Sequence, residues 1–276
     1  MSLLLDPWAQ HHRSRPLHRV NPLALMAAVL PALVALVLVR DLATPLVFLL
    51  LATGLVAVCA HVARPHRVLV FVLPTAFVLL ASLTLGLWSA PAEAATTPVL
   101  VRLGPWQYHL GTWLVGLATS LRLGALFAVA LVPGVSATGP DVVRAAVQHL
   151  RVPYRVGYTA FAAFRFVPRF GHELATIRAA HRVRGMAGGR GPLAGVRRWA
   201  GYVVPLLAGA LRHAERVALA MDARAFGAHP TRTERHTVPL RPSDAGFVAA
   251  AWAVTAAVLL WAPDLLGGLM PAVPGA

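Results

Sequence analysis

Long uninterrupted apolar runs are the feature that most limits how this chain can fold. Residues 22–39, PLALMAAVLPALVALVLV, carry no charge. A helix needs roughly 20 mostly apolar residues to cross about 30 Å of hydrocarbon. Comparable runs recur along the chain, at residues 45–63, 68–88, 112–135 and 247–266. Because 58% of all residues are hydrophobic, the sequence predicts an all-α, polytopic membrane helix bundle with five spans.

Two places in this pattern leave alternatives open. Residues 90–110 are less apolar, and we expect a short re-entrant or interfacial piece there, or a sixth span. Arg122 lies inside the fourth run. A lone charge in lipid is unfavourable, so Arg122 is expected to face the protein interior or an interface. The alternative is that the run begins or ends one turn away from the predicted boundary.

The 25 basic residues are all arginine, and their distribution predicts the orientation of the spans. Cytoplasmic loops carry the excess of positive charge. Arginines precede the first run and separate the second from the third, and seventeen lie from Arg144 to Arg241. We therefore expect a multi-pass plasma-membrane protein with a cytoplasmic N-terminus. The arginine-rich block lacks aromatic interleaving, which favours contact with the lipid bilayer over binding of nucleic acid.

The arginine-rich block predicts a cytoplasmic region over residues 138–243, between membrane parts at 1–137 and 244–276. After a short helix that begins near Thr138, a long amphipathic helix is expected from Tyr154. Its apolar face comprises Phe166, Phe170, Leu174 and Ile177, and its polar face Arg165, Arg169, His172 and Thr176. A second amphipathic helix is expected from Trp199 to Gly227. The two helices contain Pro168 and Pro205, respectively.

Both long helices are predicted to end near an arginine, in AAHRVRGMAGG (179–189) and ALAMDARAFG (218–227). Glycine commonly follows a helix because it tolerates positive φ, and arginine there complements the helix dipole. Helix termination alone therefore explains a single Arg184-Gly185. The repetition, the small alanines at each end and the bidentate chemistry of guanidinium favour a further role. We interpret Arg184 and Arg224 as a pair of docking points.

The composition limits the chemistry that this chain can perform. Without lysine it has no G-x-x-x-x-G-K-[ST] loop, so ATP would have to bind to another subunit. Cys59 is the single cysteine, which excludes an intrachain disulfide and a thiolate metal cluster. The histidines lack the spacing of an HExxH site, and we predict no metal site and no cofactor. The acids Glu173, Glu215 and Asp222 are expected to pair with Arg169, Arg212 and Arg216.

The motifs resemble those of the transmembrane T component of energy-coupling factor (ECF) transporters, the CbiQ/EcfT family. The opening LHRVNPLALM and the run LRLGALF from Leu121 are similar to that family. More specific are RFVP…E…A…RG and AE…ALAMDARAF, which occur in the family's order and at similar spacing. The resemblance covers most of the chain.

This resemblance implies a non-catalytic subunit of an ATP-driven ABC importer for a vitamin or metal micronutrient. Such a T component works with two cytoplasmic ABC ATPases and a substrate-binding membrane S component. Its two coupling helices each end in an Ala-Arg-Gly motif that docks on an ATPase. The motifs fall on Val183, Arg184, Gly185, Ala223, Arg224 and Ala225, and the supporting coupling-helix residues are Glu173, Glu215, Asp222, Pro168 and Pro205.

Two departures from the family pattern lie within these motifs. Val183 stands where alanine is usual, and Ala225 stands where glycine is usual. Because alanine favours the helix, Ala225 leaves the second helix free to continue through Phe226 to Gly227. The alternatives to a T component are an integral-membrane enzyme acting on lipid, which needs a clustered nucleophile or base, and a self-contained secondary transporter, which needs two related halves.

Overall fold

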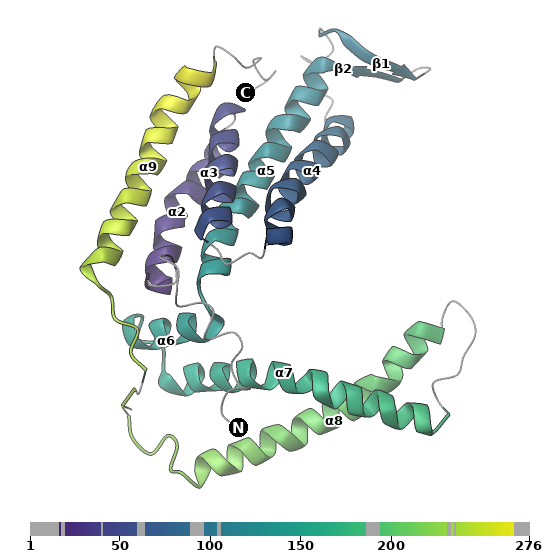
Figure 1. The fold of residues 1–276 in the computed structure, drawn as a ribbon, viewed down its shortest axis with the longest axis vertical. Coiled ribbons are helices and arrows are strands. Elements are labelled where there is room, and N and C mark those ends of the chain that lie inside the picture. Colours follow the sequence, from purple (N-terminus) through teal and green to yellow (C-terminus); the bar gives the residue numbers. More distant parts are fainter. Residues whose placement is uncertain are drawn as a thin grey trace. The chain divides into compact units, whose positions relative to one another are not determined.

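The computed structural model describes residues 17, 20–39, 41–59, 64–88, 97–103, 106–185, 194–230, 233–234 and 236–267. The chain divides into two compact units. The first comprises residues 1–138 and 239–276, and the second comprises residues 139–238. Helices dominate both units, which confirms the prediction of an all-α fold (Figure 1).

The described part of the first unit contains five apolar helices: α2 (Pro22–Leu38), α3 (Ala43–Cys59), α4 (Arg64–Trp88), α5 (Leu110–Ser136) and α9 (Pro242–Gly267). The stretches Leu110–Ser136 and Pro242–Ala262 are long and apolar enough to cross a membrane. The apolar stretches Pro22–Leu38, Ala43–Val58 and Val72–Trp88 are shorter. Each helix overlaps one of the runs from which spans were predicted.

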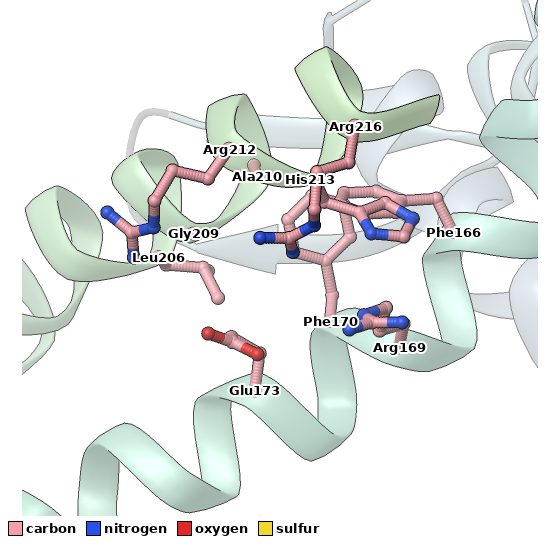
Figure 2. A pocket seen from close by; sticks show the side chains of 10 residues that line it. All are labelled: Phe166, Arg169, Phe170, Glu173, Leu206, Gly209, Ala210, Arg212, His213 and Arg216. Atoms are coloured by element: carbon pink, nitrogen blue, oxygen red, sulfur yellow. The ribbon is translucent and has the colours of Figure 1, made fainter. Parts of the chain in front are cut away.

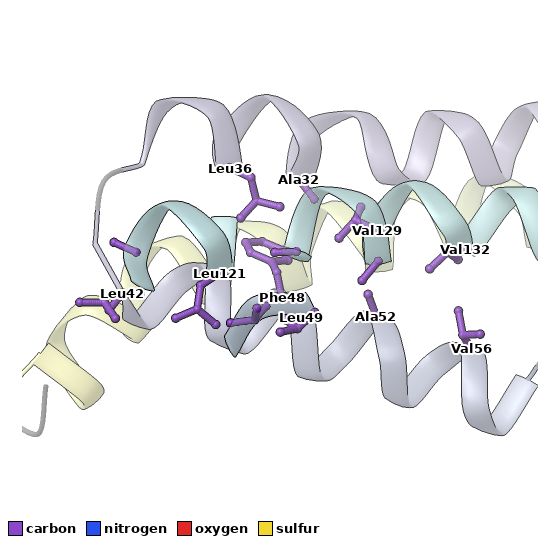
Figure 3. Packing of buried hydrophobic residues seen from close by; sticks show 14 residues of the cluster. Ala32, Leu36, Leu42, Phe48, Leu49, Ala52, Val56, Leu121, Val129 and Val132 are labelled. Carbon is purple, nitrogen blue, oxygen red and sulfur yellow. The ribbon is translucent and has the colours of Figure 1, made fainter. Parts of the chain in front are cut away.

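Helix α5 is the centre of the first unit, because it packs against α2, α3 and α4, while α9 covers α2 and α3. The buried cluster between them consists of alanine, valine, leucine and phenylalanine side chains (Figure 3). Leu36 and Ala125 are fully enclosed. Small residues let α4 and α5 approach closely. A Cβ atom at Gly116 would lie 2.5 Å from the backbone nitrogen of Gly86. Such small-residue contacts are a common way for helices to associate in lipid.

Polar side chains mark where α2 and α3 begin. The Asn21 side chain accepts a hydrogen bond from the Leu23 backbone N–H at 2.9 Å, and Pro22 occupies the first turn. The Asp41 carboxylate accepts from the Thr44 N–H at 3.0 Å and from the Thr44 hydroxyl at 2.8 Å. These caps satisfy helix N–H groups that otherwise lack partners.

Arg122 lies near the middle of the 27-residue helix α5. The expectation that it marks a misplaced helix boundary is therefore wrong. Its Nε atom is buried and has no hydrogen-bond partner among the described residues. Of the two alternatives, the structure favours an arginine that faces the protein interior.

A two-stranded hairpin precedes α5, where the sequence predicted a re-entrant or interfacial piece or a sixth span. Strands β1 (Val99–Leu103) and β2 (Trp106–His109) pair antiparallel, with Val101 opposite Tyr108. The alternating VLVRL pattern and the aromatic residues of β2 favour strands over a helix. The remainder of the predicted segment, residues 90–96 and 104–105, lies outside the described residues.

The second unit contains α6 (Gly139–His149), α7 (Tyr154–Val183) and α8 (Ala194–Asp222). Helix α7 packs against both α6 and α8. Its predicted apolar face is half-buried and its predicted polar face is exposed, which confirms the amphipathic assignment. Pro168 and Pro205 lie inside continuous helices, so neither starts a new one. Helix α8 begins five residues earlier than the expected Trp199.

The end of α8 differs from the sequence expectation. The helix ends at Asp222 and does not continue to Gly227. Ala225 has a φ of +54°, in the left-handed region that glycine usually occupies after a helix. The Ala225 N–H donates to the Asp222 carbonyl at 2.9 Å, and the Phe226 N–H donates to the Met221 carbonyl at 3.0 Å. This pair of bonds is a Schellman motif, which closes the helix although alanine stands at the left-handed position.

Gly116→Ala should destabilise the first unit, because the added Cβ would meet the backbone of Gly86 rather than a flexible side chain. We expect a loss of about 1–3 kcal/mol, measured as a lower melting temperature of the detergent-solubilised protein. Gly134→Ala in the same helix is the matched control, because a Cβ there meets nothing within 4 Å. Equal losses in the two variants would contradict the close packing.

Ala225→Gly should stabilise the end of α8 by about 1 kcal/mol, because glycine adopts positive φ without the steric conflict of a Cβ atom. Thermal unfolding of the two proteins in the same detergent measures the difference. Ala223→Gly, two residues earlier, is the control and should lower the melting temperature, since that residue lacks a positive φ. An unchanged or lower melting temperature for Ala225→Gly would show that the backbone at Ala225 is not strained.

Candidate functional site

The two predicted docking arginines have the same place in their helices. Arg184 follows the last residue of α7, and its N–H donates to the Ala180 carbonyl at 3.1 Å. Gly185 comes next, with a φ of +71°. Arg224 likewise stands directly before Ala225, whose φ is also positive. Both arginine side chains are exposed.

The two helices run antiparallel, so the structure does not bring the two arginines together. Tyr154 and Tyr158 near the start of α7 contact Phe226 beyond the end of α8, with ring centroids 5.7 and 5.6 Å apart. At the other end of α7, His181 contacts Tyr202 in the first half of α8. Arg184 and Arg224 therefore lie at opposite ends of the crossed pair (Figure 1).

The segment that follows the end of α8 is held against the first turn of α7. The Tyr154 hydroxyl donates to the His229 carbonyl at 2.7 Å, and Arg155 Nη2 donates to the Gly227 carbonyl at 2.8 Å. The ring of Phe226 lies between Tyr154 and Tyr158, edge to face with each. These contacts fix the short segment that follows Arg224. They join residues more than 60 positions apart, so the sequence pattern gave no sign of them.

The end of α7 has its own set of contacts, one to two turns before Arg184. The guanidinium of Arg178 lies over the ring of Trp199, 5.1 Å from its centroid, and 5.8 Å from that of Tyr202. His181 lies edge to face with Tyr202 at 5.1 Å. Both contacts come from the beginning of α8. We call the two helix ends that carry Arg184 and Arg224 the arginine tips. Each tip is thus positioned by aromatic side chains of the other helix.

Between the two ends, α7 and α8 cross at a group of charged and aromatic side chains around a cavity of about 50 Å³ (Figure 2). Phe166 stacks on His213, with ring centroids 4.7 Å apart. A Cβ atom at Gly209 would lie 2.9 Å from a Glu173 carboxylate oxygen, so this glycine permits the crossing. Partial burial and the charges of Arg169 and Arg216 lower the pKa of His213, while Glu173 acts in the opposite direction.

The expected ion pairs do not form. Neither Glu173, Glu215 nor Asp222 makes an ion pair or hydrogen bond with the side chains of Arg169, Arg212 or Arg216 in the described structure. Figure 2 shows the Glu173 carboxylate beside Leu206 and Gly209, away from Arg169. Exposed pairs contribute roughly 0–1 kcal/mol, too little to hold two long side chains in one geometry.

The other predicted site residues lie on or near the two helices. Val183 is the last residue of α7 and is 90% exposed, and Ala223 follows α8 with an exposed side chain. Glu215 and Asp222 are exposed on α8, and Pro168 is exposed on α7. Pro205 is half-buried. Within the described ranges, no three His, Cys, Asp or Glu side chains are grouped as metal ligands.

Comparison with known proteins places these features in a family. Residues 13–235 match the family CbiQ, described as cobalt transport protein. An ECF transporter transmembrane protein of Heliobacterium modesticaldum is 28% identical over 89% of this chain and 93% of its own length. One of Thermotoga maritima is 30% identical over 52% of this chain and 55% of its own length.

A third relative is a Bifidobacterium longum protein named as an ABC transporter ATP-binding protein. It is 28% identical over 88% of this chain, which spans only 31% of that relative's length. Together, these matches confirm the resemblance to T components of ECF transporters that the motifs indicated. Since the family match covers most of its residues, the chain belongs to the CbiQ family of cobalt transport proteins.

Proposed function

We propose that this chain is the T component of an ATP-driven ECF importer and that it transmits ATPase movement to a separate S component. Its partners are two cytoplasmic ABC ATPases and a membrane S component that binds a vitamin or metal ion. The family and the names of two relatives support the T-component role. The name of the third relative, an ATP-binding protein, fits an ATPase partner.

The observation that carries this proposal is the common geometry of the two helix ends. Arg184 and Arg224 each precede a residue with positive φ, although one of these residues is glycine and the other alanine. Each arginine is exposed just beyond the end of its helix. An arginine in that position can reach into an acidic pocket and make two parallel hydrogen bonds to a carboxylate.

The separation of the two arginines fits two partner subunits rather than one. Helix α7 has 30 residues and α8 has 29, so each is about 45 Å long. Because the helices are antiparallel, the tips lie at opposite ends of the pair. Gly185 and Ala225 complete the ends, the small side chain of Ala223 leaves space for a partner surface to approach, and Val183 is exposed to such a surface.

We further propose a multi-pass arrangement in the plasma membrane, with the N-terminus and residues 138–243 in the cytoplasm. The arginine distribution supports this orientation. Large apolar side chains of the first unit are exposed, among them Leu80 at 70%, Phe127 at 69% and Leu260 at 68%. A surface of this kind is favourable in contact with lipid and unfavourable in water.

Replacing both arginines by glutamate should prevent assembly with the ATPases. Each lost charge-assisted contact removes about 1.5–3 kcal/mol, and the new negative charge repels an acidic pocket. The experiment co-expresses the chain with tagged candidate ATPases and compares the amounts that co-purify. We expect Arg184→Glu/Arg224→Glu to reduce recovery at least tenfold.

The matched control is Arg165→Glu/Arg197→Glu, which makes the same change of charge elsewhere on α7 and α8. This control should recover the ATPases at the wild-type level. Intact recovery with Arg184→Glu/Arg224→Glu would remove the docking role of the two arginines. If no ATPase co-purifies with the wild-type chain, the proposed T-component function is itself refuted.

A further inference from the structure

Arginine side chains also gather where α7 and α8 cross, away from Arg184 and Arg224. They have no role in the proposed function. We propose that the cavity between Arg169 of α7 and Arg212 and Arg216 of α8 binds a phosphate group, either of a lipid headgroup or of free phosphate. This site is separate from the docking arginines and does not depend on their role.

The charges of the cavity favour an anion. Three arginines and Glu173 give a formal charge of +2 when His213 is neutral. None of the three guanidinium groups has an ion-pair or hydrogen-bond partner among the described residues. Because Glu173 turns toward Gly209, it leaves the arginines free to accept another anion.

Donors from two helices line the cavity. Arg212 and Arg216 are one turn apart and therefore lie on the same side of α8. Arg169 and Glu173 come from α7, on the other side of the cavity (Figure 2). The stack of Phe166 on His213 forms one wall. Partial burial, and after it the positive charges of Arg169 and Arg216, lower the pKa of His213.

A phosphate group fits these features better than a carboxylate. Free phosphate or a phosphate monoester carries a charge of about −1.5 to −2 at neutral pH and has at least three acceptor oxygens, whereas a carboxylate has one charge and two oxygens. Phosphate therefore balances the charge of the site and offers acceptors in more directions than a carboxylate. The cavity of about 50 Å³ is large enough for a small anion and too small for a folded partner segment.

The imidazole of His213 provides a direct readout of binding. It faces Arg169 and Glu173 of α7 and Arg216 of its own helix. A bound anion favours imidazolium, so inorganic phosphate should raise the pKa of His213. The experiment titrates the full-length protein in detergent, with isotope-labelled histidine, and assigns the His213 signal by its loss in His213→Asn. Sodium chloride of equal ionic strength is the reference.

Two changes of opposite effect test the residues. Arg212→Gln/Arg216→Gln should weaken phosphate binding by about tenfold or more, because each charged hydrogen bond contributes about that factor. Glu173→Gln removes the opposing charge and should tighten binding about fivefold. Arg165→Gln/Arg197→Gln removes two positive charges away from the cavity and should leave the Kd within twofold of wild type. Unchanged far-UV circular dichroism confirms that each variant is folded.

Several results would overturn the proposal: no effect of phosphate beyond that of chloride, equal weakening by the two double variants, or an equal response to acetate. The last of these would assign the site to a carboxylate, such as an acidic side chain of a partner protein.

The source of the phosphate group is distinguished by reconstitution into nanodiscs of phosphatidylcholine with or without phosphatidic acid, whose headgroup is a phosphate monoester. If the ligand is a lipid headgroup, phosphatidic acid raises the pKa of His213, and free phosphate adds nothing further. If the ligand is free phosphate, the anionic lipid has no effect and added phosphate still raises the pKa. A pKa that responds to neither in nanodiscs would contradict the site.

Discussion

The antiparallel packing of α7 on α8 is the contact on which the candidate site depends. It places the two arginine tips at opposite ends of one helix pair, and it brings together the cationic side chains at the crossing. The contacts along it are few and specific: Phe226 against two tyrosines, Phe166 on His213, and His181 against Tyr202. Helix α8 contains no buried residue. The geometry of the pair therefore rests on aromatic contacts rather than on an enclosed core.

The end of α8 illustrates how distant contacts override a local preference. A left-handed conformation costs an alanine about 1–2 kcal/mol, and alanine is the best helix former. Phe226 makes edge-to-face contacts with Tyr154 and Tyr158, and such pairs contribute about 0.5–1.5 kcal/mol each. The Arg155–Gly227 hydrogen bond adds to them. These contacts with α7 are large enough to offset the strain at Ala225.

The same reasoning separates what the sequence could predict from what it could not. Apolar runs and the spacing of Phe166 and Phe170 depend on local periodicity, so the helices and the half-buried face of α7 were predictable. The end of α8 and the cavity at its crossing depend on pairs such as Phe166 with His213, 47 positions apart. The expected ion pairs were wrong for another reason. Proximity along a helix does not order two exposed side chains when their attraction is weak.

The charges at the crossing also bear on the stability of the helix pair. Arg169 of α7 and Arg216 of α8 line the same cavity as His213, so like charges from the two helices lie at their contact. This repulsion opposes the stacking of Phe166 on His213 and is smallest when His213 is neutral. An anion between the arginines would replace the repulsion by attraction and draw the helices together. Since both tips are positioned by the same helix pair, occupancy of the cavity would also stabilise the positions of Arg184 and Arg224.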